Sequence, residues 1–152
     1  MKRIIAIDPG KSGGIIFTQD GLFAIDEPMP ETDGDVVEML DTAIANGCRE
    51  AWVEQVGGYC GGKGAPGSAM FNFGQGYGFI LGVLAARFVR VNLVRPQQWQ
   101  KHFSLGTAKS CASKSEWKNK LKQKAQQLFP THSVTLKTAD AFLLYEYAQR
   151  QP

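Results

Sequence analysis

The sequence predicts an α/β domain in which five short strands form a sheet flanked by helices. Short runs of apolar and β-branched residues alternate with longer segments whose apolar residues recur at helical spacing. Their order along the chain is three strands, helix, strand, helix, strand and further helices. Residues 1–152 contain no internal repeat and no long linker, so we expect one domain.

The first half of the chain contains four of the predicted strands. Turn residues at Pro9-Gly10 and Asp20-Gly21 separate three runs that indicate an antiparallel meander. A helix capped by Asp33 or Asp35 follows and ends near Asn46-Gly47. The strands predicted in this half cover residues 2–7, 14–18, 22–25 and 50–56.

The second half begins with a glycine-rich loop over residues 57–67 and a long helix over 68–88, with Ser68 as its cap. Gly74, Gly78 and Gly82 recur every four residues in this helix. Such spacing predicts close approach of another backbone, from the sheet or from a second copy of the chain. The remaining predicted elements are a strand over 89–94, helical turns over 97–103, a polar loop over 105–113, and helices over 115–128 and 138–149.

Composition places the protein among soluble intracellular domains. With 43% hydrophobic residues, a chain of 152 residues can bury about two thirds of the surface that its unfolded form exposes. Cys48, Cys60 and Cys111 are an odd number without zinc-ligand spacing, which predicts a reducing cytoplasm and no structural zinc. The N-terminal segment has only four consecutive apolar residues, too few for a signal peptide or a membrane span of roughly 20. We therefore expect a cytoplasmic protein without membrane association.

Charge is unevenly distributed along the chain. Residues 1–54 contain eleven acidic and four basic side chains, whereas residues 87–124 contain ten basic side chains and Glu116 as the one acid. A concentrated basic segment is what binding to a phosphate backbone requires, because each bound lysine or arginine releases a condensed counterion. A solvated helix face is an equally ordinary explanation of the same pattern.

Three carboxylates occupy positions that packing does not explain well. Asp8 follows the apolar run IIAI directly and precedes a Pro-Gly turn, and Glu54 follows a second apolar run. In α/β sheets, ligands bind at the carboxyl ends of neighbouring strands, so these two acids face each other if their strands are adjacent. Asp140 begins an otherwise apolar helix.

Carboxylates that converge in one cleft repel each other, and a hard divalent cation is the usual way to relieve that repulsion. Two Mg²⁺ ions in such a cluster can activate a water, stabilise a leaving oxygen and hold a phosphate between them. Taken singly, each acid is more often an ordinary strand-end or cap residue. Their joint placement predicts a metal-dependent phosphodiesterase site formed by Asp8, Glu54 and Asp140.

Several segments, in order over nearly the whole chain, resemble the RuvC-type Holliday junction resolvases, especially their phage-like branch. They are IAIDPGKSGG, WVEQV, MFNFGQGYGFILGVL, VRPQQWQK, QQLFP and KTADAFLL. The resemblance implies a ribonuclease-H-like fold with a five-stranded mixed sheet, a homodimer, two Mg²⁺ or Mn²⁺ ions, and paired nicks in branched DNA at a four-way junction. The nicks would leave 5′-phosphate and 3′-hydroxyl ends. In the family's pattern, the strand-one acid falls on Asp8, the strand-four acid on Glu54 and the last-helix acid on Asp140.

One position departs from the family's pattern. Many members have an aspartate or histidine three residues before the last acid, where this chain has Lys137. A protonated lysine cannot bind a cation. Either Lys137 supplies charge to a phosphate or to the transition state, or the second metal is held more weakly by water and DNA oxygens, or activity is reduced or lost.

Basic and aromatic residues near these acids are candidates for DNA contact. Lys11 and Ser12 follow Asp8 in the turn, and Tyr59 and Lys63 lie in the glycine-rich loop. An aromatic ring there would stack on an unpaired base. Lys109, Lys114 and Lys118 flank or open the basic helix, where we expect them at phosphates.

Three alternatives remain open from the sequence. The chain could be a related nuclease that acts on RNA or on other branched substrates, because the fold and the carboxylates do not specify the polymer. It could be a catalytically weak or inactive protein that binds branched DNA, since Lys137 replaces a ligand. The sugar-kinase and actin-like superfamily also begins with a strand and an acidic turn, but it needs more than twice this length.

Overall fold

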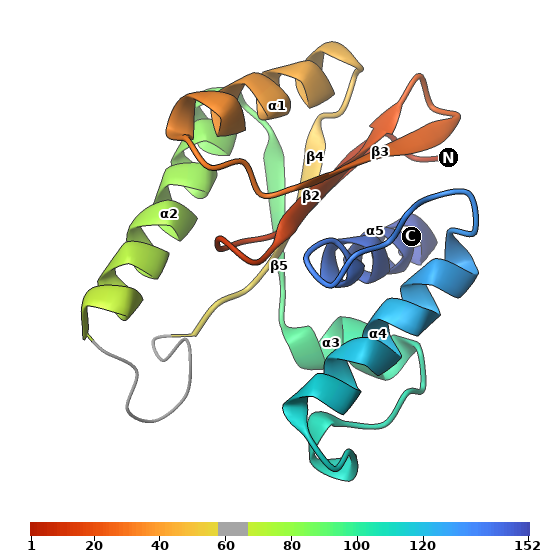
Figure 1. Cartoon of the computed structure of the whole chain (residues 1–152). Helices are drawn as coiled ribbons and strands as arrows, with labels where there is room; N and C mark the ends of the chain where they lie inside the picture. The colour runs from red at the N-terminus through yellow and green to blue at the C-terminus, as the bar shows by residue number, and fades with distance from the viewer. Residues whose placement is uncertain (58–66) are drawn as a thin grey trace.

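The computed structural model describes residues 1–57 and 67–152 and contains a five-stranded mixed sheet between two layers of helices (Figure 1). The strand order is β3-β2-β1-β4-β5. The first three strands form the predicted antiparallel meander, and β4 and β5 continue the sheet parallel to β1. The bounds are β1 Ile4–Asp8, β2 Gly14–Gln19, β3 Phe23–Pro28, β4 Glu50–Glu54 and β5 Arg90–Val94.

Helices α1 and α2 lie on one side of the sheet, and α3, α4 and α5 lie on the other (Figure 1). Their bounds are α1 Asp33–Ala45, α2 Gly67–Ala86, α3 Pro96–His102, α4 Lys114–Leu128 and α5 Ala139–Arg150, with a 3-10 turn η1 at Ala108–Ser110. We call the two sides of the sheet the α1 face and the α5 face. Helix α5 packs directly against β1, β2 and β4.

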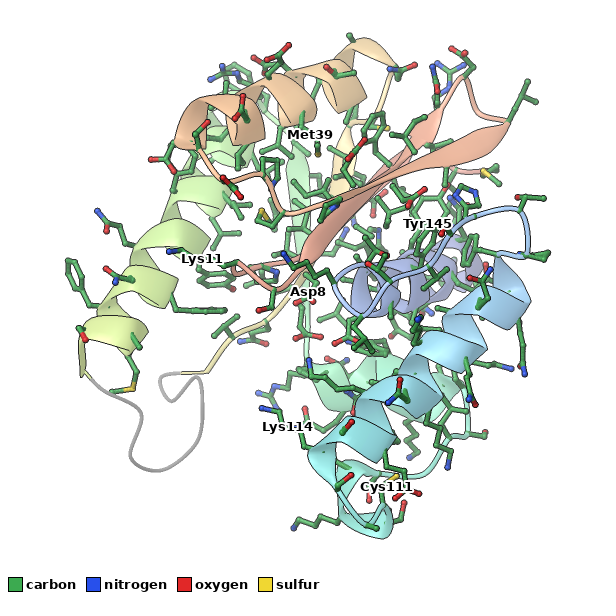
Figure 2. All side chains as sticks on the ribbon, viewed as in Figure 1. Asp8, Lys11, Met39, Cys111, Lys114 and Tyr145 are labelled. Atoms are coloured by element: carbon green, nitrogen blue, oxygen red, sulfur yellow. The ribbon has the colours of Figure 1, made fainter. Side chains whose placement is uncertain are left out.

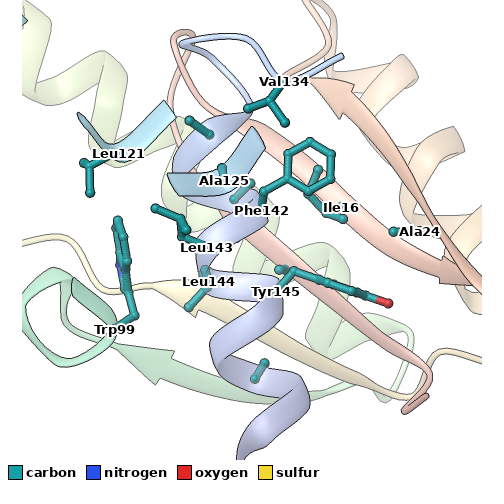
Figure 3. Packing of buried hydrophobic residues seen from close by; sticks show 14 of the residues in the cluster. Ile16, Ala24, Trp99, Leu121, Ala125, Val134, Phe142, Leu143, Leu144 and Tyr145 are labelled. Carbon is teal, nitrogen blue, oxygen red and sulfur yellow. The ribbon is translucent and has the colours of Figure 1, made fainter. Parts of the chain in front are cut away.

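Alternation along the strands divides the core between the two faces, because successive side chains of a strand point to opposite sides. In β1, Ile4 and Ala6 join the cluster on the α5 face, whereas Ile5 and Ile7 join the cluster on the α1 face. On the α5 face, Phe142, Leu143 and Tyr145 of helix α5 share a buried cluster with Trp99 of α3 and Leu121 of α4 (Figure 3). Both layers of helices are therefore fixed to the same central strand.

The cap of α1 differs from the sequence expectation. The N-cap is Thr32, whose hydroxyl accepts a hydrogen bond from the Asp35 backbone N–H at 3.1 Å. Asp33 and Asp35 lie instead in the first turn of the helix, where the positive end of its dipole favours acidic side chains. A threonine just before two aspartates satisfies the capping requirement one position earlier than we expected.

Helix α2 is less covered than its apolar sequence suggests. A Cβ added at Gly74, Gly78 or Gly82 would meet no atom of residues 1–57 or 67–152 within 4 Å, so these glycines do not pack against the sheet. Phe71 is 70% exposed. Among the described residues, α2 is long and apolar enough to cross a membrane, with 17% of its most apolar window buried, although core helices of soluble proteins also pass this test. One side of α2 thus lacks a covering element within the described chain.

Candidate active site

Asp8 ends β1 at the carboxyl edge of the sheet, where a tight turn wraps closely around it. The turn is closed by a hydrogen bond from the Gly13 backbone N–H to the Gly10 carbonyl at 3.0 Å. A Cβ at Gly13 would lie 2.0 Å from the Asp8 carbonyl oxygen, so only glycine fits there. Gly10 adopts φ +104°, a conformation that other residues rarely adopt. The sequence Pro-Gly-Lys-Ser-Gly after Asp8 therefore sets the position of this carboxylate.

Glu54 ends β4, the parallel neighbour of β1. The register pairs Ile7 with Val53, which places Asp8 and Glu54 side by side at the ends of their strands. Val53 belongs to the cluster on the α1 face, so alternation directs Glu54 to the α5 face. Asp8 follows Ile7, which also faces α1, and points to the α5 face in the same way. β1 and β4 are therefore neighbouring strands, a pairing that the sequence left open.

Asp140 approaches these two acids from α5. It lies in the first turn of that helix, where the helix dipole favours a carboxylate. Its neighbours Ala139, Ala141 and Phe142 are buried, so the packing of α5 on β1 fixes this end of the helix. Three segments far apart in the sequence thus contribute one carboxylate each to the same place.

The electrostatics of the site reflect burial first and repulsion among the carboxylates second. Burial, followed by repulsion from Glu54 and Asp140, raises the pKa of Asp8 well above its usual range. Burial and repulsion from Asp140 raise the pKa of Glu54 to about 7. Burial also raises the pKa of Asp140. The cluster therefore resists full ionisation near neutral pH unless a positive charge joins it.

Lys118 is the basic side chain that acts on all three acids. It projects from α4, is partly buried, and lowers the pKa of Asp8, Glu54 and Asp140. From its position in a basic helix, Lys118 was expected at a DNA phosphate. Its location beside the carboxylates was not visible from that pattern, because it depends on how α4 packs against α5.

Trp99 is a second residue whose contact with the site the sequence did not reveal. It is fully buried in the core, and its Nε1–H donates a hydrogen bond to Glu54 Oε2 at 2.8 Å. The hydrogen bond lowers the pKa of Glu54, against the larger effect of burial. A buried tryptophan needs an acceptor for its N–H, which was the available signal, but periodicity could not identify the acceptor.

The donor set suits a hard divalent cation, because carboxylate oxygens are the ligands that Mg²⁺ and Mn²⁺ prefer. Raised pKa values show that positive charge would be favoured at this place. As they stand, however, no three His, Cys, Asp or Glu side chains in residues 1–57 and 67–152 are close enough to hold one ion together. A cation bound by Asp8, Glu54 and Asp140 would have to draw their side chains inward.

Lys137 lies at the start of α5 but lines two surface hollows beside it. One, of about 1110 Å³, extends along β3 and α1 and is shared with Lys11, and the other, of about 710 Å³, is shared with Lys122. Within the described part of the chain, neither hollow is lined by the three carboxylates. The Lys137 side chain is exposed. Lys137 is thus a surface lysine, and the larger hollow that it lines also contains Glu27, Glu31, Asp35 and Glu38.

The other candidates for DNA contact that the structure describes are exposed side chains. Lys11 and Ser12 are exposed in the turn after β1, and Lys114 is exposed at the start of α4. Figure 2 shows Asp8 between Lys11 and Lys114. Lys109 is exposed in η1. Tyr59 and Lys63 fall outside the described residues.

Comparison with known structures shows which fold this is. The chain is similar to the Thermus thermophilus RuvC structure, with a TM-score of 0.59 at 14% identity, over 98% of this chain and 96% of that one. T. thermophilus RuvC in complex with Holliday junction substrate gives a TM-score of 0.61 at the same identity and coverage. No family model matches the chain, and no curated protein matches its sequence. The five-stranded mixed sheet with flanking helices is the ribonuclease-H-like fold of RuvC, as predicted.

Proposed function

We propose that the protein is a structure-selective DNA endonuclease that resolves Holliday junctions, of the phage-like branch of RuvC-type enzymes. One observation carries the proposal: Asp8, Glu54 and Asp140 converge from β1, β4 and α5 with raised pKa values. They do so in a fold shared with a structure of RuvC bound to a Holliday junction. We expect residues 1–152 to act as one nuclease domain in the cytoplasm.

In this proposal, Asp8, Glu54 and Asp140 would hold two Mg²⁺ ions, for which Mn²⁺ could substitute, and such ions would supply positive charge at the phosphodiester and lower the pKa of a bound water. The reaction forms a bond between phosphorus and the water oxygen and breaks the bond to the 3′ oxygen, which takes a proton. Lys118 offsets negative charge as the phosphate approaches the carboxylates. Lys11, Ser12, Lys109 and Lys114 bind neighbouring phosphates. Tyr59 and Lys63 would contact the opened junction.

The test uses labelled four-way junction and a matched linear duplex, incubated with the purified protein in Mg²⁺, in Mn²⁺ and in a chelator. We expect symmetric nicks in the junction alone, with 5′-phosphate and 3′-hydroxyl ends, and none in the chelator. RNA–DNA hybrid and flap substrates extend the comparison. Preferential cleavage of either of these would make the protein a related nuclease with another substrate.

We also propose a homodimer that pairs two copies through α2. Gly74, Gly78 and Gly82 leave room for a second backbone, and the exposed apolar surface next to them includes Phe71. Two active sites on one junction would account for paired nicks. A second copy, rather than a lipid bilayer, is the occupant we propose for this side of α2.

Replacing Gly78 with Glu should convert the dimer to a monomer, because a charged side chain would enter the seam. Gly34→Glu is the matched control, since Gly34 is also exposed in a helix but does not belong to the glycine row of α2. Light scattering after size exclusion measures the mass of each. A wild type that is monomeric with and without junction DNA would contradict the pairing.

A second candidate is a protein that binds branched DNA without cutting it. It is favoured by Lys137, which stands where related enzymes have an acid or histidine, and by the absence of three ligands within reach of one ion in the described chain. Tight junction binding in both Mg²⁺ and chelator, without nicks in Mg²⁺ or Mn²⁺, would establish this reading.

A further inference from the structure

The connection from β5 to α3 places a buried tryptophan at the end of β4. Glu54 is paired with Val94, the last residue of β5, and the Gln55 backbone N–H donates to the Val94 carbonyl at 2.7 Å. Helix α3 begins two residues later at Pro96, and the Arg95 N–H is capped by Gln98 Oε1 at 2.9 Å. The start of α3 is therefore fixed relative to the carboxylate of Glu54.

Trp99 completes the first turn of α3 and faces the sheet. Its ring is fully buried against the cluster that contains Leu121 and Leu143 (Figure 3). Close packing leaves such a ring no alternative orientation, so its one donor, Nε1–H, has a fixed direction. That donor meets Glu54 Oε2 at 2.8 Å.

We propose that Trp99 is a positioning residue that orients the carboxylate of Glu54 so that Oε1 is the oxygen offered to a divalent cation. The proposal rests on the nuclease function proposed above. A free glutamate has several rotatable bonds and would lose that freedom on binding an ion. Trp99 restricts one oxygen beforehand, without adding the positive charge that a lysine or arginine would bring and that would oppose cation binding.

Other tryptophans of the chain show that this contact is specific to Trp99. Trp117 is buried in the same cluster, but it follows the start of α4 and belongs to the packing of α4 on α5. The Nε1 of Trp52, which lies on β4 two residues before Glu54, is buried and has no hydrogen-bond partner among the described residues. Trp99 therefore differs from two indoles nearby in holding a site carboxylate.

The test compares Trp99→Phe, which keeps an aromatic ring but removes the N–H, with Trp117→Phe as the control for ring truncation in the same cluster. Isothermal titration with Mn²⁺ in the absence of DNA measures cation affinity directly. We expect Trp99→Phe to weaken it about 10- to 100-fold, the usual cost of removing a hydrogen-bond partner of a metal ligand. Trp117→Phe should match the wild type, and junction affinity in chelator should be unchanged in both variants.

A Glu54→Gln background separates positioning from general loss of structure. If Trp99 acts through Glu54, adding Trp99→Phe to Glu54→Gln causes no further loss of Mn²⁺ affinity. Should Trp99→Phe fold poorly by circular dichroism, 3-benzothienylalanine at position 99 keeps the shape of indole and replaces only the N–H with sulfur.

Equal Mn²⁺ affinity of the wild type and the N–H-deficient variants would overturn the positioning role and leave the nuclease proposal standing. The same holds for an equal loss in the Glu54→Gln background, which would indicate an effect on the fold. A wild type that neither binds Mn²⁺ nor cuts any junction would overturn the nuclease proposal, and the role of Trp99 with it.

Discussion

The two faces of the sheet use the same strands for different purposes. On the α1 face, β1 contributes Ile5 and Ile7 to an apolar cluster with α1 and α2. On the α5 face, the same strand contributes Ile4, Ala6 and then Asp8, whose pKa is raised by burial and by neighbouring acids. The α1 face therefore stabilises the fold by packing alone, whereas the α5 face carries unfavourable charge at its edge. A group held at such a cost is a candidate for function.

Asp8→Asn should have the largest effect, because it removes the carboxylate charge at the end of β1, beside the end of β4. We expect junction cleavage to fall by about 10³-fold or more, comparable to losing a group that stabilises transition-state charge. Single-turnover cleavage of labelled junction measures it. Asp20→Asn is the control, since Asp20 is exposed in a turn with φ 52°, which asparagine tolerates. Cleavage that survives Asp8→Asn would contradict the assignment of the site.

Lys118→Met should have the next largest effect, because Lys118 is the base that lowers the pKa of all three acids. We expect cleavage at saturating junction to fall about 10- to 100-fold. Lys120→Met is the matched control, since Lys120 is exposed on the same helix. If Lys118 acts only as a phosphate contact, Lys118→Met will instead weaken junction binding and cut saturated junction at the wild-type rate.

Much of the α1 face was predictable from sequence, and less of the α5 face. Periodicity located the strands and helices, and the position of Asp8 and Glu54 after apolar runs indicated a shared edge of the sheet. Whether their strands were neighbours depended on the crossover through α1, which the structure resolves as parallel pairing of β1 with β4. The pattern within each strand or helix therefore predicted the carboxylates, but not the side chains that contact them.

Trp99 and Lys118 show why those partners were missed. Both belong to helices with other plausible roles, Trp99 as core and Lys118 as part of a basic surface. Their contacts with the carboxylates arise where three helices meet the ends of two strands, a relation between elements with no local signature. The prediction for the glycines of α2 was incomplete for a different reason. Their spacing was visible in the sequence, but no described element of this chain approaches them.

A smaller effect should appear in the pH dependence of stability without metal. Since the folded pKa of Asp8 is raised above its unfolded value, its contribution is present at low pH and lost as pH rises toward the folded pKa. In chelator at about pH 7.5, Asp8→Asn should therefore raise the melting temperature, by about 2 to 4 °C for each kcal/mol of relieved repulsion. The gain should shrink toward about pH 4.5, where the unfolded carboxyl also begins to bind a proton.

Leu40→Ala provides the contrast from the α1 face. Leu40 is fully buried, and truncating it should cost about 2–5 kcal/mol at either pH, because no titrating group is involved. Thermal unfolding followed by circular dichroism measures both variants, and Mg²⁺ should raise the melting temperature of the wild type but not of Asp8→Asn. A pH-independent effect of Asp8→Asn would mean that its charge is not opposed in the folded state.

Lys137→Met should have the smallest effect, because Lys137 lines surface hollows with Lys11 and Lys122 rather than the carboxylate cluster. As one phosphate contact, its loss should reduce the salt dependence of junction binding by about one unit of slope and leave cleavage of saturated junction unchanged. Lys137→His tests the opposite reading, in which position 137 reaches the metal. If the histidine raises Mn²⁺ affinity, this position belongs to the site and the lysine weakens it. If both variants cut saturated junction at the wild-type rate, the three carboxylates and Lys118 are sufficient for cleavage. Lys137 then lies outside the active site at the edge of the α5 face.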